Sequence, residues 1–400
     1  MHSLPRHGLG DPGMTGIGAR ATNLRGLALC LALALLAACG PAGIKAPPPV
    51  SPAASSVSPA ASPSGSPVAA GCPGAFHPPA ATVTASYPTA LAFAPDGRLF
   101  YAERTGTIRV WQAGGAVAFA SVPTVTTEAL GTYSERGLLG LAISPHFGQD
   151  HFVYAFYSEA DRSTQRVVRF TDDCAGHGTA EATVVANLPG GSDCCHKGGR
   201  LAFGTDGDLY VTLGETHVPS AAQDKCDPRG KVLRYTPDGR PAPGNLCGPV
   251  YAYGLRNPFG IAFAPDGRLF VTNNGPSGDA GGPGTGYDTV EIVQAGANYQ
   301  WPACYGYSHA IGGGMCPAGS LGPDYSTEAS TIVPTGATWV TSGPLAGHFV
   351  FCSYATDTLK VFRGPRDVQD GPHGCALDVK QGPDGALYFS DSGSIYRYVG

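Results

Sequence analysis

Charged residues are scarce in this chain of 400 residues: Asp, Glu, Lys and Arg together make up only 14% of it, where about a quarter is usual. That scarcity, together with 58 Gly and 36 Pro, excludes a coiled coil, a helix bundle and a charged disordered chain. Positive charge is also short, because 25 Lys and Arg stand against 30 Asp and Glu and leave a formal net charge of -5. No basic field exists to attract phosphate backbones, so we expect no nucleic-acid partner.

The apolar segment near the start of the chain is too short to cross a membrane. Leu27–Ala38 holds 12 residues, whereas a hydrocarbon core is ~30 Å thick; a run of this length after two arginines suits a signal peptide. It ends in Ala-Ala-Cys-Gly, which resembles the lipobox of bacterial lipoproteins, with Cys39 as the acylated residue. An ordinary signal peptide beside a chance cysteine is the alternative. We expect residues 1–38 to be removed and Cys39 to anchor an exported lipoprotein on the extracytoplasmic side of a bacterial cell membrane, with no other membrane contact.

Residues 39–71 are predicted to be a linker. The stretch from Pro41 to Ala70 consists almost entirely of Pro, Ala, Ser and Gly and has no aromatic side chain. Such a segment cannot offset its ordering entropy by burying apolar surface. The folded body is therefore expected to span residues 72–400.

The chain lacks a Cys-x-x-Cys pair, which argues against zinc thiolates as the role of its cysteines. Ten cysteines lie in the predicted body, an even number that favours disulfides in an exported protein. Proximity in sequence predicts three pairs: Cys226–Cys247, Cys304–Cys316 and Cys352–Cys375. Cys72–Cys174 is left over, and Cys194 and Cys195 either pair with each other or staple different loops.

One sequence motif recurs along the predicted folded region. It stands as LAFAPDGRLFYAE from Leu91, LAFGTDGDLYVTLGE from Leu201, IAFAPDGRLFVTNNG from Ile261 and VKQGPDGALYFSD from Val379, with looser copies from Leu141 and Gly343. Each copy is typical of a β-hairpin, since apolar residues flank an Asp-Gly turn. Six hairpins of one kind favour an all-β, six-bladed β-propeller of four-stranded antiparallel blades over a β-sandwich. We expect residues 395–399 to close the ring against a strand near residues 81–87.

Four stretches, in this order, resemble the soluble quinoprotein glucose/sorbosone dehydrogenase family. They are SERGLLGLAISPHF (134–147), CCHKGGRLAFGTDGDLYVTLGE (194–215), YGLRNPFGIAFAPDGRLFVTNNGP (253–276) and YDTVEIVQAGANYQWP (287–302). The resemblance implies a six-bladed propeller that uses pyrroloquinoline quinone (PQQ) and Ca²⁺ to oxidise a small sugar. Absence of a Gly-x-Gly-x-x-Gly turn in a βαβ context agrees with a cofactor other than a nicotinamide.

The resemblance also assigns roles. His196 would take the proton from the anomeric hydroxyl, Glu215 would orient that imidazole, and Arg256 would stabilise charge at the quinone with Asn257 beside it. Backbone carbonyls of Gly275 and Pro276 would hold the calcium ion. Without the family resemblance, the His-Lys-Gly-Gly and Asn-Gly-Pro segments would be interpreted as ordinary turns.

Several positions depart from the family pattern. The Lys and the two Arg that offset the three PQQ carboxylates are matched by Ala355, Cys375 and Leu377, and Cys195 replaces an acidic residue. Arg136 falls on a substrate-binding glutamine position. Other cations available in principle are Lys197, Arg136, Lys360 and Arg363. A Cys194–Cys195 ring beside the quinone would make both cysteines part of the cofactor site.

Two functions of different class follow. The first is a tethered dehydrogenase that oxidises an aldose or related sugar alcohol and passes electrons to an acceptor that the sequence does not identify. The second is a propeller that has lost PQQ and binds carbohydrate or protein without catalysis. A calcium-dependent lactonase is a third hypothesis, for which the sequence offers no distinctive carboxylate set.

Overall fold

The computed structural model describes Cys72, Pro79 and residues 82–400 of the chain. The predicted signal peptide, the lipidation site Cys39 and the linker to residue 71 lie outside the described residues.

The recurring hairpins form as the sequence predicts. In the first, the amide of Gly97 donates to the carbonyl of Ala94 at 2.9 Å, and Asp96 Oδ1 accepts the amide of Arg98 at 3.0 Å. Gly97 has a φ of 92°, a conformation that glycine adopts without a steric penalty. The turn at Asp266 and Gly267 repeats this geometry: the amide of Gly267 donates to the carbonyl of Ala264 at 2.9 Å, and Asp266 Oδ1 accepts the amide of Arg268 at 3.1 Å.

Within residues 82–400, the strands form six four-stranded antiparallel sheets and one two-stranded sheet. The first three blades are β2–β5 (Pro88–Phe93, Leu99–Glu103, Thr107–Gln112, Gly115–Ser121), β6–β9 (Leu138–Ile143, Phe152–Ser158, Thr164–Asp172, Gly178–Pro189) and β10–β13 (Leu201–Phe203, Leu209–Leu213, Lys231–Tyr235, Val250–Tyr253). The next two are β14, β15, β16 and β19 (Asn257–Phe263, Leu269–Asn274, Thr289–Val293, Tyr325–Ser326) and β20–β23 (Pro334–Trp339, Phe349–Ser353, Thr358–Gly364, Asp367–His373). The sixth blade consists of β24, β25, β26 and β1 (Val379–Gln381, Leu387–Ser390, Ser394–Tyr398, Thr82–Thr84). The separate two-stranded sheet consists of β17 and β18 (Cys304–Tyr305, His309–Ala310).

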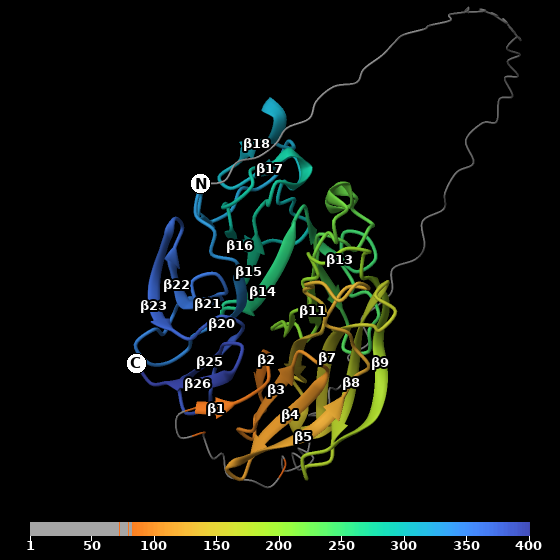
Figure 1. Cartoon of the computed structure of the whole chain (residues 1–400), viewed down its shortest axis with the longest axis vertical. Coiled ribbons are helices and arrows are strands. Elements are labelled where there is room, and N and C mark those ends of the chain that lie inside the picture. Colours follow the sequence, from red (N-terminus) through yellow and green to blue (C-terminus); the bar gives the residue numbers. More distant parts are fainter. Residues whose placement is uncertain (1–71, 73–78, 80–81) are drawn as a thin grey trace, which may run out of the picture. The chain divides into compact units, whose positions relative to one another are not determined.

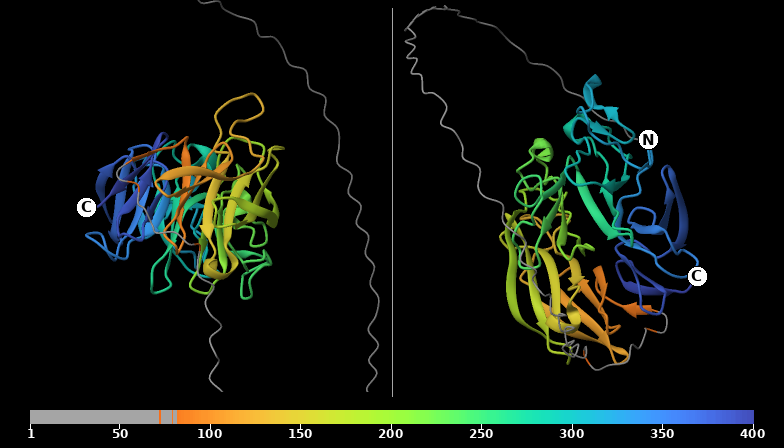
Figure 2. Two further views of the ribbon diagram at one scale, coloured as in Figure 1. Left: turned by 90° about the horizontal axis from the view of Figure 1, so that it is seen from below. Right: turned by 180° about the vertical axis from the view of Figure 1, so that it is seen from behind.

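The blades follow one another round a ring in chain order, as Figure 1 shows from β2 (orange) to β25 (blue). The first strand of every blade contacts the first strand of the next, and β24 contacts β2. Strand β1 completes the last blade, where Thr82 pairs with Tyr396 and Thr84 with Ser394. The six-bladed propeller and its predicted closure are confirmed, and Figure 2 shows the ring edge-on and from behind.

Six clusters of buried apolar side chains hold the ring together, each between two neighbouring blades. Phe156 and Val167 of the second blade, for example, share a cluster with Leu209 and Leu233 of the third. A blade cannot bury both faces alone, so its neighbours complete the core.

Helix is rare in the described part of the chain: one short α-helix, α1 (Phe147–Asp150), and three 3-10 turns, η1 (Pro219–Gln223), η2 (Asp279–Gly281) and η3 (Ile311–Gly313). No helix among these residues has the length and apolar character needed to cross a membrane.

All ten cysteines of the described residues are in disulfides. The pairs are Cys72–Cys174, Cys194–Cys195, Cys226–Cys247, Cys304–Cys316 and Cys352–Cys375. The pairs predicted by proximity are confirmed, Cys194 and Cys195 bond to each other, and no thiolate of this part of the chain is left for zinc.

Candidate active site

The predicted site residues come together at one end of the ring because they stand at matching ends of hairpin strands. His196 precedes β10 and Glu215 follows β11, its hairpin partner. Asn257 begins β14, and Gly275 follows β15 in the same way. The start of one antiparallel strand lies beside the end of the next, so both pairs meet at the same edge.

His196 and Glu215 form a buried pair. The imidazole Nδ1 contacts Oε1 of Glu215, and the two residues are 4% and 0% exposed. The second carboxylate oxygen, Oε2, is buried without a hydrogen-bond partner. Burial, followed by the charge of Arg256, lowers the pKa of His196, so its imidazole is neutral at pH 7 and can accept a proton at Nε2. Burial raises the pKa of Glu215.

A second histidine fixes the plane of the first. The rings of His196 and His217 stack with centroids 4.1 Å apart and planes 9° from parallel. His217 Nδ1 lies 3.7 Å from Asp193 Oδ2. His196, Thr216 and His217 all have positive φ angles, between 53° and 63°. Non-glycine residues in this conformation store strain, which gathers at functional sites.

Arg256 is held beside this pair by an acidic loop. Its Nε and Nη2 donate to the two carboxylate oxygens of Asp279 at 2.8 and 3.0 Å, and Nη2 also reaches Ser277 Oγ at 3.2 Å. Asn257 Nδ2 lies 3.3 Å from Oε2 of Glu135, and its Oδ1 accepts the amide of Gly198. The guanidinium and the amide are therefore fixed in place.

One open cleft with a volume of about 300 Å³ is lined by His196, Arg256, Asn257, Gly275, Pro276 and Cys195. Glu215 lies behind His196 and does not line it. A second space with a volume of about 80 Å³ adjoins it, and we call it the axial pocket; its walls include Tyr87, Arg104, Glu135, Arg200, Tyr354 and Leu377. Both spaces share Glu135, Asn257, Asn274 and Val333.

The axial pocket lies on the axis of the ring. Residues at or just before the first strand of every blade line it: Thr89, Leu139, Arg200, Phe259, Thr335 and Leu377. The cleft and the axial pocket together form one hollow at the centre of the propeller.

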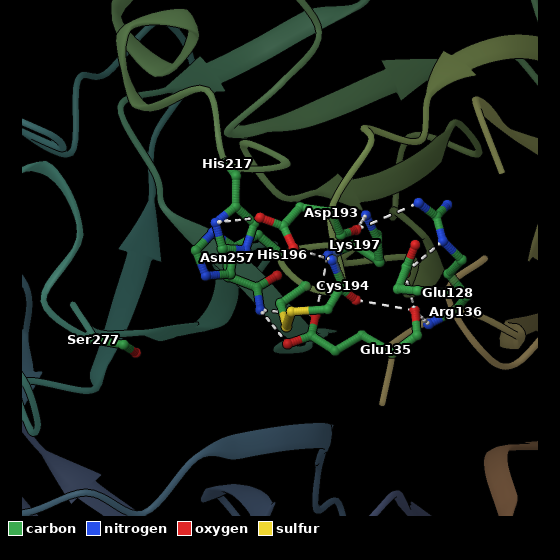
Figure 3. The surroundings of a disulfide bond; sticks show 12 residues. Glu128, Glu135, Arg136, Asp193, Cys194, His196, Lys197, His217, Asn257 and Ser277 are labelled. Atoms are coloured by element: carbon green, nitrogen blue, oxygen red, sulfur yellow. Dashed lines mark hydrogen bonds and ion pairs between the residues drawn. A yellow bond between two sulfur atoms is a disulfide. The ribbon is translucent and has the colours of Figure 1, made fainter. Parts of the chain in front are cut away.

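The vicinal disulfide forms part of the cleft wall. Figure 3 shows it between Glu135 and the stacked histidines. Cys195 lines the cleft, whereas the carbonyl of Cys194 accepts the amide of Glu135 at 2.8 Å and the hydroxyl of Ser134 at 3.1 Å. The ring thus ties the His196 segment to the segment that carries Glu135, and the reading in which the two cysteines staple different loops is wrong.

The predicted metal ligands are suited to a hard cation. Asp288 fixes this segment, because its Oδ1 accepts the amide of Gly275 at 2.8 Å. No hydrogen bond from another described residue occupies the carbonyl oxygen of Gly275 or Pro276. A Cβ at Gly275 would collide with the Gly286 carbonyl oxygen, so glycine is required there. Free carbonyls and a nearby carboxylate are the oxygen ligands that Ca²⁺ takes.

The alternative cations named from the sequence do not line either space. Arg136 is fully buried and pairs with Glu128 at 2.8 Å, and Figure 3 shows it turned away from His196. Lys197 donates to the backbone carbonyls of Gly190 and Asp193. Lys360 pairs with Asp370 on the fifth blade. Glu135, and not its neighbour Arg136, lines the cleft, because the ion pair with Glu128 holds Arg136 away from it.

Five residues of the site escaped the sequence analysis: Glu135, His217, Asp279, Arg104 and Arg200. His217 and Arg104 could have been found, since each follows the second strand of a repeat, as Glu215 does. Asp279 lies in a glycine-rich loop with no repeat to place it.

The hollow fits a flat, anionic quinone. Arg256 and Asn257 line the cleft, and two further arginines line the axial pocket. Buried polar atoms without partners also stand there, among them Asn274 Oδ1 and Arg200 Nε. Because unpaired buried polar atoms are costly, they are the groups that a ligand would satisfy.

Known proteins resemble this chain along most of its length. The family model described as Glucose / Sorbosone dehydrogenase matches residues 85–397. Aldose sugar dehydrogenase YliI of Escherichia coli K12 is 30% identical over 332 residues, which cover 76% of this chain and 86% of that protein. Quinoprotein glucose dehydrogenase B of Acinetobacter calcoaceticus is 30% identical over 56% of this chain and 52% of its own length. The PQQ-bound structure of an aldose sugar dehydrogenase from Streptomyces coelicolor shares 30% identity with a TM-score of 0.65, and the match covers 80% of this chain and 96% of that one.

Proposed function

Because the chain belongs to the glucose/sorbosone dehydrogenase family, we propose that it is a PQQ-dependent dehydrogenase that oxidises an aldose or a related sugar alcohol. The observation that carries the proposal is the buried His196–Glu215 pair, which opens on the same cleft as Arg256 and Asn257. A neutral imidazole backed by a carboxylate is the arrangement of a general base. The PQQ-bound structure of the Streptomyces coelicolor relative supports the choice of cofactor.

His196 removes the proton of the anomeric hydroxyl at Nε2, since Nδ1 is engaged by Glu215. Glu215 keeps the ring oriented and stabilises the imidazolium that results. PQQ, when bound, supplies an electrophilic quinone that accepts the hydride from the same carbon. The proton and the hydride together account for the two hydrogens that separate an aldose from its lactone.

The other cleft residues bind and orient. Arg256, fixed by Asp279, places a positive charge where negative charge develops during hydride transfer. Glu135 reaches both spaces, where its carboxylate can accept hydrogen bonds from sugar hydroxyls. Gly275 and Pro276 would hold Ca²⁺ through their carbonyls.

The test is dye reduction by the purified chain with PQQ, Ca²⁺ and a panel of sugars. His196→Gln should lower kcat by about 10³-fold, and Glu215→Gln by about 10²-fold, because a positioned general base contributes a factor of this order. Glu291→Gln is the matched control: this glutamate is buried with an unpaired oxygen, as Glu215 is, but its other oxygen accepts the hydroxyl of Thr289 and does not contact His196. Equal loss in all three variants, or unchanged turnover in His196→Gln, would contradict the proposal.

A non-catalytic, sugar-binding propeller is the second candidate. It is favoured by Asp279, which engages two donor nitrogens of Arg256 and so competes with a quinone for them. Sugar binding without any PQQ binding would select this function over the first.

We also propose that the protein is an exported lipoprotein anchored through Cys39. The short apolar run before Ala-Ala-Cys-Gly supports this, and five disulfides suit an oxidising compartment. Fatty-acid labelling of the expressed protein should be lost in Cys39→Ser. Labelling that persists in the variant would place the modification elsewhere.

A further inference from the structure

The cleft and the axial pocket carry opposite charge. Three carboxylates line the cleft, those of Glu135, Asp279 and Asp288, against the single guanidinium of Arg256. In the axial pocket, Arg104 and Arg200 face one acidic side chain among the described lining residues, that of Glu135. A ligand with a neutral and an anionic end would therefore place its anionic end in the axial pocket.

Arg200 crosses the ring to reach this pocket. It stands just before the first strand of the third blade, but its guanidinium donates to the carbonyl of Thr89 in the first blade and, at 2.8 Å, to the carbonyl of Leu377 beside the sixth. Its one nearby carboxylate, that of Asp378, lies 3.6 Å away and is also 3.3 Å from Lys380. A buried arginine and a partly exposed lysine thus share one buried carboxylate, so part of the positive charge remains uncompensated.

Arg104 contributes the second charge at the rim. Its guanidinium donates to the backbone carbonyls of Arg136 and Thr126, both at 2.9 Å, and of Ser134. Within the described residues no carboxylate pairs with it. The guanidinium lies 5.1 Å from the ring centroid of Tyr87, so it is oriented by carbonyls and an aromatic face but not neutralised.

Arg104 and Arg200 lie close to positions where the family pattern has a lysine and arginines that this chain lacks. Leu377, which stands where the family pattern has an arginine, lines the axial pocket, and Arg200 bonds to its carbonyl. Tyr354, next to the unmatched lysine position at Ala355, lines the same pocket. Charge lost from the fifth and sixth blades is thus replaced at the same place from the third and first blades.

We propose that Arg104 and Arg200 bind the carboxylates of the quinone in the axial pocket, with the hydroxyls of Tyr87 and Tyr354 at its rim. The inference rests on the proposed function, because it assigns residues to the cofactor of that function. It places the carboxylates on the ring axis and leaves the acidic cleft to Ca²⁺ and the sugar.

The experiment measures equilibrium binding of two probes, PQQ and its uncharged trimethyl ester, by quenching of protein fluorescence in the presence of Ca²⁺. Arg104→Gln should weaken PQQ binding by about 10- to 100-fold, the range for a charge-assisted hydrogen bond, and leave ester binding within about twofold. Arg363→Gln is the matched control, since Arg363 is exposed on β22 and lines neither space. Wild-type affinity for PQQ, but not for the ester, should fall with added salt.

Arg200→Lys is the second variant, because a buried Arg that bonds to two blades can be needed for folding. Lysine keeps the charge and loses the paired donors, so PQQ should bind more weakly than to the wild type by about 10-fold at an unchanged unfolding midpoint. Should Arg200→Lys fail to fold, Arg104→Gln decides the matter. Unchanged PQQ affinity in Arg104→Gln overturns this inference and leaves the proposed function standing. A wild-type protein that binds neither probe overturns both.

Discussion

Between neighbouring blades the buried side chains are mostly hydrocarbon, as where Phe156 and Val167 pack with Leu209, whereas the end of the ring around its axis buries ionisable groups such as His196 and Glu215. A tyrosine of such an apolar layer has its hydroxyl satisfied, because Tyr154 donates to the carbonyl of Pro237 at 3.0 Å. At the axial end a carboxylate oxygen of Glu215 is buried without a partner and the backbone of His196 has a positive φ. Both features are destabilising. The difference indicates that the repeated hairpins provide the stability and that the strand ends use part of it to hold chemical groups in fixed places.

Two disulfides repeat this contrast. Cys72–Cys174 closes a loop over a sequence separation of 102 residues and joins the start of the described chain to the second blade. Cys194–Cys195 joins adjacent residues in the wall of the cleft. Because a crosslink stabilises a protein by restricting its unfolded chain, its contribution grows with the length of the loop that it closes.

Replacing both members of each pair with serine gives the largest effect that we expect. Removal of Cys72–Cys174 should lower the free energy of unfolding by about 4–5 kcal/mol, and removal of Cys194–Cys195 by about 1 kcal/mol. Urea unfolding of the two double variants, each compared with wild type, measures both values. The second variant should instead lower turnover, since it loosens the segment that holds His196. Equal losses of stability would mean that the vicinal pair stabilises the propeller as much as the long-range pair does.

The ring of repeated hairpins could be predicted from the sequence because the turn motif of each hairpin is local and recurs along the chain. Asp96 and Gly97 form a turn by bonds within a few residues, and the same bonds recur at Asp266 and Gly267. Closure by β1 and β26 followed from the need to complete the last sheet. His196, Asn257 and Gly275 could be placed at one edge for a related reason, since each adjoins a strand of a recurring hairpin.

The rest of the site depends on contacts between distant segments. Arg200 reaches Leu377 across the ring, a contact that no local pattern contains. Asp279 stands in a glycine-rich loop whose path is set by its bond to Arg256 and not by any periodicity. Arg136 and Glu135 are adjacent in the sequence, and it is the ion pair of Arg136 with the distant Glu128 that holds Arg136 away while Glu135 lines the cleft.

The smallest effect that we expect is the dependence of the free energy of unfolding on pH that the buried His196 causes. Burial, with the charge of Arg256 next, lowers the pKa of His196 in the folded protein, while the unfolded chain titrates near the ordinary value of about 6.5. Below about pH 6.5 the His196 side chain takes up a proton in the unfolded chain but not in the folded protein. Proton uptake therefore favours the unfolded state, and the free energy of unfolding decreases as the pH falls below about 6.5. Between pH 6.5 and 5.5 the loss is about 1 kcal/mol for one such group. Glu215, whose pKa is raised by burial, contributes a slope of opposite sign in this window, so the measurement is made in a Glu215→Gln background.

In that background, the free energy of unfolding by urea should fall by about 1 kcal/mol more with His196 present than with His196→Gln over the same pH step. His146→Gln is the matched control, because His146 is exposed before α1 and its imidazole makes no hydrogen bond or ion pair with another described residue. Its slope should follow that of the background protein. Parallel curves for His196→Gln and the background would mean that His196 takes up a proton within the fold. The axial end would then be as open to water and protons as the outer face, and the contrast with the blade interfaces would be lost there.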